Sequence, residues 1–137
     1  MWYTQENISI SFNVLNERLL DQFFQSWRSS VENSEKLCIY KLIKTDFVIE
    51  EYLCKGINVR LLSNLRFGTL KLNIECGRFI NQPHNERLCQ CCNMNSIETE
   101  YHFVMVCPAY RQLRLRYFSQ YYCSWPNMQK FCALLNA

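Results

Sequence analysis

The feature that most constrains this chain is the run Cys89-x2-Cys92-x9-His102-x4-Cys107, in which four metal-binding residues occur at short spacings. A Cys-x2-Cys pair lets one tight turn direct two thiolates at a single ion. A His and a Cys four residues apart can complete a tetrahedron from the end of a helix. Four protein ligands leave no open position for water, so such a site stabilises a fold and does not activate a nucleophile. The spacing therefore predicts a structural Zn²⁺ bound by Cys89, Cys92, His102 and Cys107.

The same four residues have a second interpretation as ordinary core side chains, because cysteine is among the most buried residue types. Cys91 lies inside the same turn and is an alternative ligand, although its Cys-x-Cys offset from Cys89 would be cramped. The remaining cysteines are scattered singly among apolar neighbours, and we predict that they are reduced structural residues: Cys38, Cys54, Cys76, Cys123 and Cys132.

A secreted, disulfide-bonded scaffold is a third interpretation of nine cysteines in 137 residues. The odd number disfavours it, and the N-terminus has neither the basic start nor the apolar run of a signal peptide. No apolar stretch approaches the roughly 20 residues that a membrane helix needs. We therefore expect an intracellular protein, nuclear or cytoplasmic and not secreted, with no membrane partner.

The net charge of +3 is unevenly distributed along the chain. Residues 1–52 carry five basic and eight acidic side chains, whereas residues 53–137 carry ten basic and four acidic ones. The half that holds the predicted zinc site is therefore the candidate surface for a polyanion such as RNA or DNA.

Helical periodicity dominates the chain. Apolar side chains recur at steps of three and four near the N-terminus, at Ile8, Phe12, Leu15, Leu19, Phe23 and Trp27. Further helices are predicted over 34–43, 58–67, 98–106, from Pro108 to Tyr117, and over 128–135. Alternation of Leu70, Leu72 and Ile74 with polar residues favours a short strand ending at Gly77, with a short helix as the alternative.

These patterns predict a mainly α, small helical domain with a zinc knuckle, in which a short β-hairpin or turn over 87–93 pairs with a helix. We divide the chain into an amphipathic helical N-terminal region, residues 1–55, and a basic zinc-knuckle helical domain, residues 56–137. Since the N-terminal helix is acidic and amphipathic, it is a candidate surface for a protein partner.

Three segments resemble the C-terminal zinc-binding region of LINE-type (non-LTR) retrotransposon reverse transcriptases. They are residues 75–79 (Glu-Cys-Gly-Arg-Phe), residues 87–92 (Arg-Leu-Cys-Gln-Cys-Cys) and residues 97–110, which contain Glu98, His102, Cys107 and Pro108. The resemblance is specific around residues 87–110 and looser from about Trp27 to Leu135. It implies the same four zinc ligands, with Glu98 as the acidic residue that precedes the His, and it implies contact with RNA or target DNA.

The predicted function is a zinc-stabilised, non-catalytic module that binds nucleic acid. Candidate phosphate contacts are Arg60, Arg66, Lys71, Arg78, Arg87, Arg111 and Arg114, interleaved with Phe67, Phe79 and Tyr110, which could stack on bases. The only aspartates are Asp21 and Asp46, which do not form the adjacent pair that two-metal phosphoryl transfer requires. We expect neither an enzyme nor a small-molecule substrate. The alternative is a structural or protein-interaction domain, a decayed or repurposed retroelement fragment without nucleic-acid binding.

Overall fold

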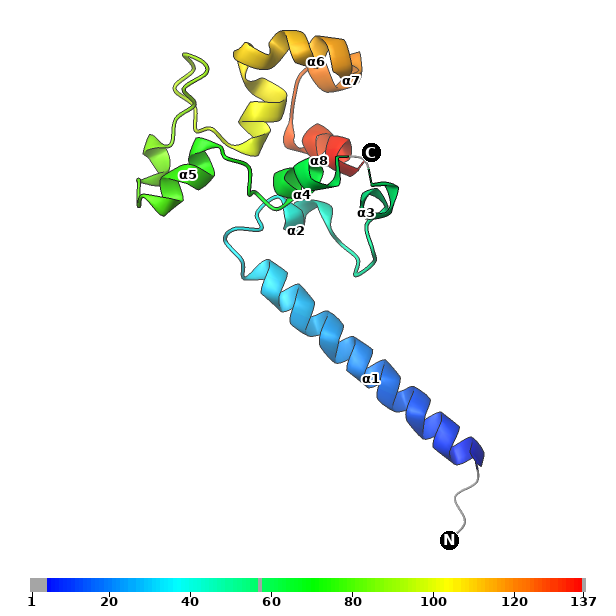
Figure 1. Ribbon diagram of the computed structural model, residues 1–137. Coiled ribbons are helices and arrows are strands. Elements are labelled where there is room, and N and C mark those ends of the chain that lie inside the picture. Colours follow the sequence, from blue (N-terminus) through cyan, green and yellow to red (C-terminus); the bar gives the residue numbers. More distant parts are fainter. Residues whose placement is uncertain (1–4, 57, 137) are drawn as a thin grey trace. The chain divides into compact units, whose positions relative to one another are not determined.

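The computed structural model describes residues 5–56 and 58–136, which fold as two compact units that divide between Glu35 and Lys36 (Figure 1). The α-helices are α1 (Gln5–Glu32), α2 (Tyr40–Ile43), α3 (Glu51–Lys55), α4 (Val59–Arg66), α5 (Asn73–Phe79), α6 (Arg111–Tyr117), α7 (Gln120–Cys123) and α8 (Met128–Asn136). Two 3₁₀ turns, η1 (His84–Glu86) and η3 (Pro108–Tyr110), and one π-helical turn, η2 (His102–Val106), complete the set. No β-strand occurs in these residues, so the predicted mainly α class is confirmed.

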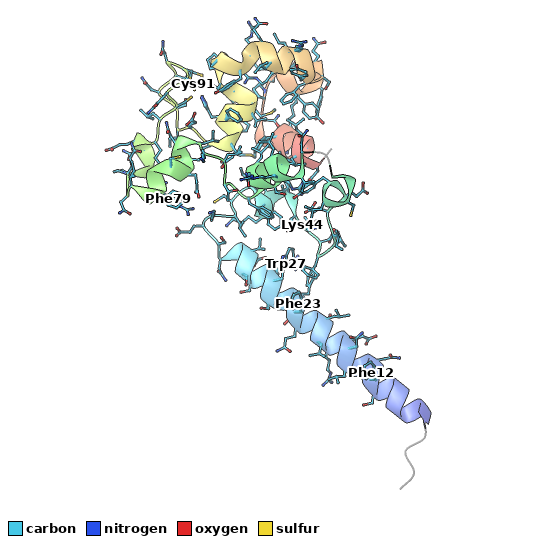
Figure 2. The ribbon with its side chains drawn as sticks, viewed as in Figure 1. Phe12, Phe23, Trp27, Lys44, Phe79 and Cys91 are labelled. Carbon is cyan, nitrogen blue, oxygen red and sulfur yellow. The ribbon has the colours of Figure 1, made fainter. Side chains whose placement is uncertain are left out.

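The first unit is the single long helix α1, which contains the predicted N-terminal helix. Its apolar stripe faces solvent in part, since Phe12, Leu15 and Leu19 are each more than half exposed (Figure 2). The side chain of Ile8, the first member of the stripe, lies outside the residues whose side chains are described.

The core of the second unit consists of Ile43 from α2, Met105 from η2, and Phe131 and Leu135 from α8. Phe131 is fully buried, and Tyr101 meets its ring edge-on at a centroid distance of 5.7 Å. Each such side chain removed from water stabilises the fold by about 1.5–3 kcal/mol. The core therefore joins the turn that carries His102 to the N- and C-terminal parts of the unit.

A buried arginine ties α4 to the end of α8. Arg66 is 2% exposed; its Nη1 donates to the carbonyl of Leu135 at 2.6 Å and its Nη2 to Glu50 Oε2 at 2.8 Å. Its guanidinium also lies 5.0 Å from the ring centroid of Tyr52. Lys44 Nζ forms an ion pair with the other oxygen of Glu50 at 3.2 Å. A positive group near the C-terminus of a helix complements the partial negative charge there.

Two local predictions left an alternative open, and the structure selects between them. The strand expected up to Gly77 is replaced by α5, the alternative that the sequence left open, because the backbone N–H of Asn73 at its start donates to Glu98 Oε2 at 2.7 Å. Of the hairpin or turn expected over 87–93, the structure has the turn, closed by one antiparallel bridge between Leu88 and Ile97. The Cys89–Cys92 turn is therefore held by the bridge and not by paired strands.

Residues 36–55 belong to the second compact unit, while the division of the chain after residue 55 stays a prediction. No helix among those described has the length and apolar content needed to cross a lipid bilayer.

Candidate metal centre

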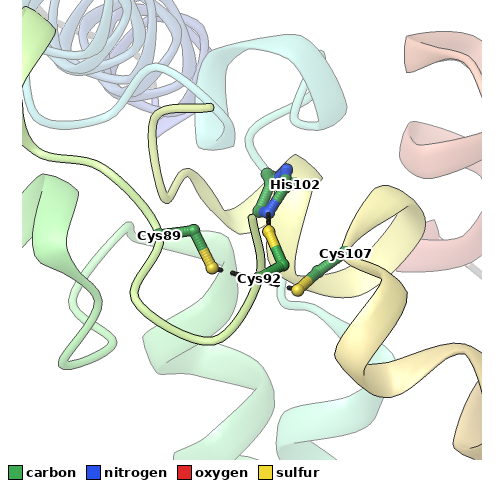
Figure 3. Close-up of side chains that lie close together, drawn as sticks. All are labelled: Cys89, Cys92, His102 and Cys107. Carbon is green, nitrogen blue, oxygen red and sulfur yellow. Dashed lines mark hydrogen bonds between the residues drawn. The ribbon is translucent and has the colours of Figure 1, made fainter. Parts of the chain in front are cut away.

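Two elements of the second unit supply the four predicted ligands. Cys89 and Cys92 lie on the loop that follows η1, and His102 and Cys107 lie at the start and just past the end of the π-helical turn η2 (Figure 3). Cys89, His102 and Cys107 are buried, and Cys92 is half-buried. The structure thus brings together four donors that are separated by up to 18 residues in the chain.

Backbone hydrogen bonds close the loop that presents the first two cysteines. The N–H of Cys89 donates to the carbonyl of Ser96 at 2.9 Å, and the N–H of Glu98 donates to the carbonyl of Arg87 at 2.9 Å. Asn95 has a positive φ of 50°, a conformation that asparagine tolerates better than most residues. The loop therefore has a defined geometry before any metal is considered.

The π-helical turn sets the direction of the other two donors. The N–H of Cys107 donates to the carbonyl of His102 at 2.7 Å, so the turn is one residue wider than an α-helical turn. At its start the Thr99 hydroxyl accepts from the N–H of His102 at 3.1 Å, which caps the helix. Cys107 then has an extended ψ of 121°, as expected before Pro108.

Two of the distances between donors lie close to those expected for tetrahedral zinc. Zn–S bonds of about 2.3 Å and Zn–N bonds of about 2.05 Å place two sulfurs about 3.8 Å apart and a sulfur and a nitrogen about 3.6 Å apart. The Sγ atoms of Cys89 and Cys107 are 3.9 Å apart, and Cys92 Sγ is 3.4 Å from His102 Nε2 (Figure 3). All four donor atoms lie within 4.8 Å of one another. The group could therefore hold one metal ion.

Without a metal ion, the surroundings of the buried Cys89 favour its protonated thiol over the thiolate. Burial raises the pKa of Cys89 to about 12, and a backbone hydrogen bond from Met94 lowers the pKa of Cys92. Burial also lowers the pKa of His102, which keeps the imidazole neutral and its lone pair available. A divalent cation would replace thiol protons here and compensate the buried thiolates.

Two charged side chains hold the ligands from outside the group. Glu98 is buried, and Cys89 Sγ lies 3.7 Å from its Oε1 while its other oxygen accepts from Asn73. Arg114 on α6 donates from Nη2 to the carbonyl of Cys107 at 2.6 Å. Partial burial lowers the pKa of Arg114. Hydrogen-bonding groups that orient the ligands affect the metal affinity of a site, and such groups commonly surround protein metal sites.

Cys91, the alternative ligand, belongs to a second group of donors. Its sulfur lies within 4.8 Å of donor atoms on Cys89 and Glu98, but Cys91 itself is exposed. The Tyr110 hydroxyl donates to Cys91 Sγ at 3.5 Å, and this hydrogen bond raises the pKa of Tyr110 to about 12. Three donors, one of them a carboxylate, match structural zinc less well than the three sulfurs and one nitrogen of the first group.

The remaining cysteines do not approach the group. Cys54 and Cys76 are exposed thiols, and Cys123 and Cys132 are half-buried ones. Cys123 Sγ donates to the carbonyl of Arg114 at 3.6 Å. These thiols are not joined in disulfides, which agrees with the prediction of reduced cysteines.

The predicted phosphate contacts fall into two sets. Arg66, Arg87 and Arg114 donate to groups within the chain, Arg87 to the carbonyls of Gln82 and Ile74 at 2.8–3.0 Å. Their guanidiniums hold the fold together, so we do not retain them as candidate phosphate contacts. The set that is exposed at the surface comprises Arg60, Lys71, Arg78 and Arg111, of which Arg78 also forms an ion pair with Glu75 at 3.4 Å.

Sequence reasoning missed two contributors to the centre. Thr99 caps the turn that carries His102, and its signal was a threonine three residues before the histidine. Asn73 reaches the loop through its side-chain amide, which donates to the carbonyl of Leu88 at 2.7 Å, and through its N–H on Glu98. No local signal could have found Asn73, because its partners are 15 and 25 residues away.

Comparisons of the chain with protein-family models, with curated proteins and with solved structures return no match. What the geometry itself establishes is a mainly helical chain with a Cys₃His group that could hold a metal ion.

Proposed function

We propose that the chain is a zinc-stabilised, non-catalytic module that binds nucleic acid. The observation that carries the proposal is the convergence of Cys89, Cys92, His102 and Cys107, whose donor atoms lie within 4.8 Å of one another. Three thiolates and one imidazole are a donor set that structural zinc prefers. With all four positions filled by protein, the ion has no site for a reactive water, which supports a role without catalysis.

The zinc content of the protein tests the first half of the proposal. Protein purified under reducing conditions without chelators is expected to contain about one zinc per chain, measured by elemental mass spectrometry. A Cys92→Ser, His102→Ala double variant provides the matched control and is expected to lose the ion. Metal-free wild-type protein that is nevertheless folded would overturn the zinc site.

Charge and exposure support the second half. Residues 53–137 hold ten basic and four acidic side chains, and Lys71, Arg78 and Arg111 are exposed. The resemblance of residues 87–110 to the C-terminal region of LINE-type reverse transcriptases also favours an RNA or DNA partner. It further favours a place inside the cell, where the cysteines stay reduced.

Salt dependence tests this contact with nucleic acid. Phosphate contacts release counterions, so the affinity for labelled single-stranded RNA or DNA should fall steeply as salt rises from about 50 to about 200 mM. Fluorescence anisotropy with zinc-loaded protein measures the slope. Each of Lys71→Gln and Arg111→Gln should reduce the slope by about one. Binding that is indifferent to salt would contradict the phosphate contacts.

A second candidate function is a protein-interaction domain that uses α1. Its support is the exposure of Phe12 (70%), Leu15 (54%) and Leu19 (56%) along a helix with an acidic balance. Apolar side chains at such spacings are typical of helix-in-groove recognition. Sedimentation over a range of concentrations, with a Leu15→Glu, Leu19→Glu variant as control, tests self-association through this face. If the wild-type protein is a monomer throughout that range, α1 does not mediate self-association.

A further inference from the structure

Of the three aromatic side chains that the sequence suggested for base stacking, only Phe79 reaches solvent, at 76% exposed. Phe67 packs on Tyr40 at a centroid distance of 4.9 Å, and Tyr110 packs edge-on against Phe103 at 4.8 Å. By contrast, three aromatics within nine residues of α6, α7 and the following turn are well exposed: Tyr117 (67%), Tyr121 (61%) and Trp125 (89%). This group, residues 117–125, is called the aromatic segment below.

Basic groups lie directly against the aromatic segment. The Arg116 guanidinium is 5.4 Å from the ring centroid of Tyr117, and Lys130 Nζ is 4.6 Å from that of Tyr121. Lys130 Nζ also donates to the carbonyl of Ser124, next to Trp125. After Glu100 the sequence contains no Asp or Glu, whereas it contains Arg111, Arg114, Arg116 and Lys130. The charged side chains of residues 101–137 are therefore all basic.

The backbone at Trp125 adds an independent observation. Its φ is +50°, in the left-handed region that bulky L-residues rarely adopt. Such a conformation costs free energy and persists only where neighbouring structure imposes it. Here it accompanies the most exposed of the large apolar side chains among the residues described. An exposed Trp125 ring does not contribute to the core, and its backbone conformation is strained. We therefore look for its role in binding a ligand.

We propose that the aromatic segment is a stacking platform for single-stranded nucleic acid, with bases on Tyr117, Tyr121 and Trp125 and phosphates beside Arg116 and Lys130. Exposed rings interleaved with cations are the combination that unpaired bases and their backbone require. A duplex hides its base faces, so the platform should discriminate against it. The inference rests on the proposed function, to which it adds the place of binding and the form of the ligand.

An apolar protein partner fits the segment less well. Leu113 and Leu115 are each 54% exposed. However, the Arg116 guanidinium lies over the ring of Tyr117, and the Lys130 ammonium lies over the ring of Tyr121. Charge complementarity therefore selects an acidic ligand with flat apolar faces, and nucleic acid supplies both in each nucleotide.

The test uses the full, zinc-loaded chain and fluorescein-labelled oligo(dT) and oligo(U) of about 20 nucleotides. Trp125→Ala and Tyr121→Ala are each expected to weaken binding roughly tenfold. Trp125→Asn also removes the indole ring, but asparagine tolerates a positive φ. Weaker oligonucleotide binding by this variant is therefore not explained by a destabilised backbone. Phe12→Ala, which removes an aromatic side chain of similar exposure (70%) from the acidic helix α1, is the matched control and should bind like wild type (Figure 2).

A second readout follows Trp125 itself. Replacing Trp2 and Trp27 by phenylalanine leaves Trp125 as the single tryptophan, since the chain has three. Stacking on bases should quench its fluorescence on addition of oligo(dT) or oligo(U). A blunt duplex of the same length should quench it less and bind more weakly.

The outcomes separate this inference from the proposed function. Salt-dependent binding that survives unchanged in Trp125→Asn and Tyr121→Ala, without quenching, would overturn the platform while leaving nucleic-acid binding intact. Equal affinity for duplex and single strand would also overturn it. Absence of binding by wild-type protein at low salt would overturn the proposed function, and the platform with it.

Discussion

Glu98 and Asn73 are joined by a hydrogen bond of 2.7 Å, in which the first backbone N–H of α5 donates to a buried carboxylate oxygen. The other oxygen of Glu98 lies 3.7 Å from the sulfur of Cys89. The Glu98 carboxylate therefore accepts a hydrogen bond at the start of α5 and also contacts the candidate metal ligand Cys89. It connects α5 to the Cys₃His group.

Glu98→Ala should therefore lower the free energy of unfolding by about 1–3 kcal/mol, because it leaves the N–H of Asn73 without its acceptor. Glu98→Gln keeps one oxygen and should lose less. Thermal unfolding of the zinc-loaded variants measures both, and Glu86→Ala, at an exposed residue, is the control. Equal melting temperatures for Glu98→Ala and Glu86→Ala would show that the buried carboxylate does not support α5.

Cys107→Ser should be far more damaging than Cys123→Ser. Loss of a zinc ligand removes metal-linked folding free energy and should cost about 4 kcal/mol or more. Cys123 contacts only the carbonyl of Arg114 among its described hydrogen bonds, and a serine there should cost less than about 1 kcal/mol. Denaturant unfolding under reducing conditions compares the two. Equal stabilities would refute the assignment of Cys107 as a ligand.

The apparent affinity for Zn²⁺ should rise with pH. Burial raises the pKa of Cys89 to about 12 in the metal-free chain, so near neutral pH Zn²⁺ must displace its proton. Since zinc binds the thiolate, each proton released makes binding about tenfold tighter per pH unit. His102 adds no slope above its ordinary titration range, because burial lowers its pKa and keeps it neutral there.

Competition with a chromophoric chelator between about pH 6.5 and about pH 8 measures this slope. The chelator titrated alone supplies the correction for its own protonation. An affinity that does not change with pH would contradict binding through cysteine thiolates.

Arg66→Met should destabilise the second unit by about 3–5 kcal/mol, because it leaves Glu50 and the carbonyl of Leu135 without their buried donor. Arg66→Lys should also be costly, since an ammonium cannot reproduce the two directions of the guanidinium fork. Arg60→Met, on the same helix but exposed, is the matched control and should stay within about 0.5 kcal/mol of wild type. Chemical denaturation followed by circular dichroism distinguishes them.

The sequence predicted the metal-binding residues because their chemistry is local: two short spacings and a proline set the geometry of Cys89, Cys92, His102 and Cys107. It also located α4 and α8 closely, since their apolar periodicity is regular. It could not select the helix before Gly77, because α5 begins with a hydrogen bond from the N–H of Asn73 to Glu98, which is 25 residues away. It also treated Arg66 as a surface charge, because burial depends on partners such as Leu135 at the other end of the unit.

The π-helical turn also has a consequence for insertions in this segment. In a regular α-helix, positions 102 and 107 would be rotated by about 140° from one another, so their side chains would diverge. The wider turn, closed by the bond from Cys107 N–H to His102 O, brings both to the same group. A single-residue insertion between them would place the two positions about 120° apart in a regular helix and separate the two donors. The five-residue step from His102 to Cys107 therefore tolerates point substitutions that keep the turn, but it does not tolerate an insertion.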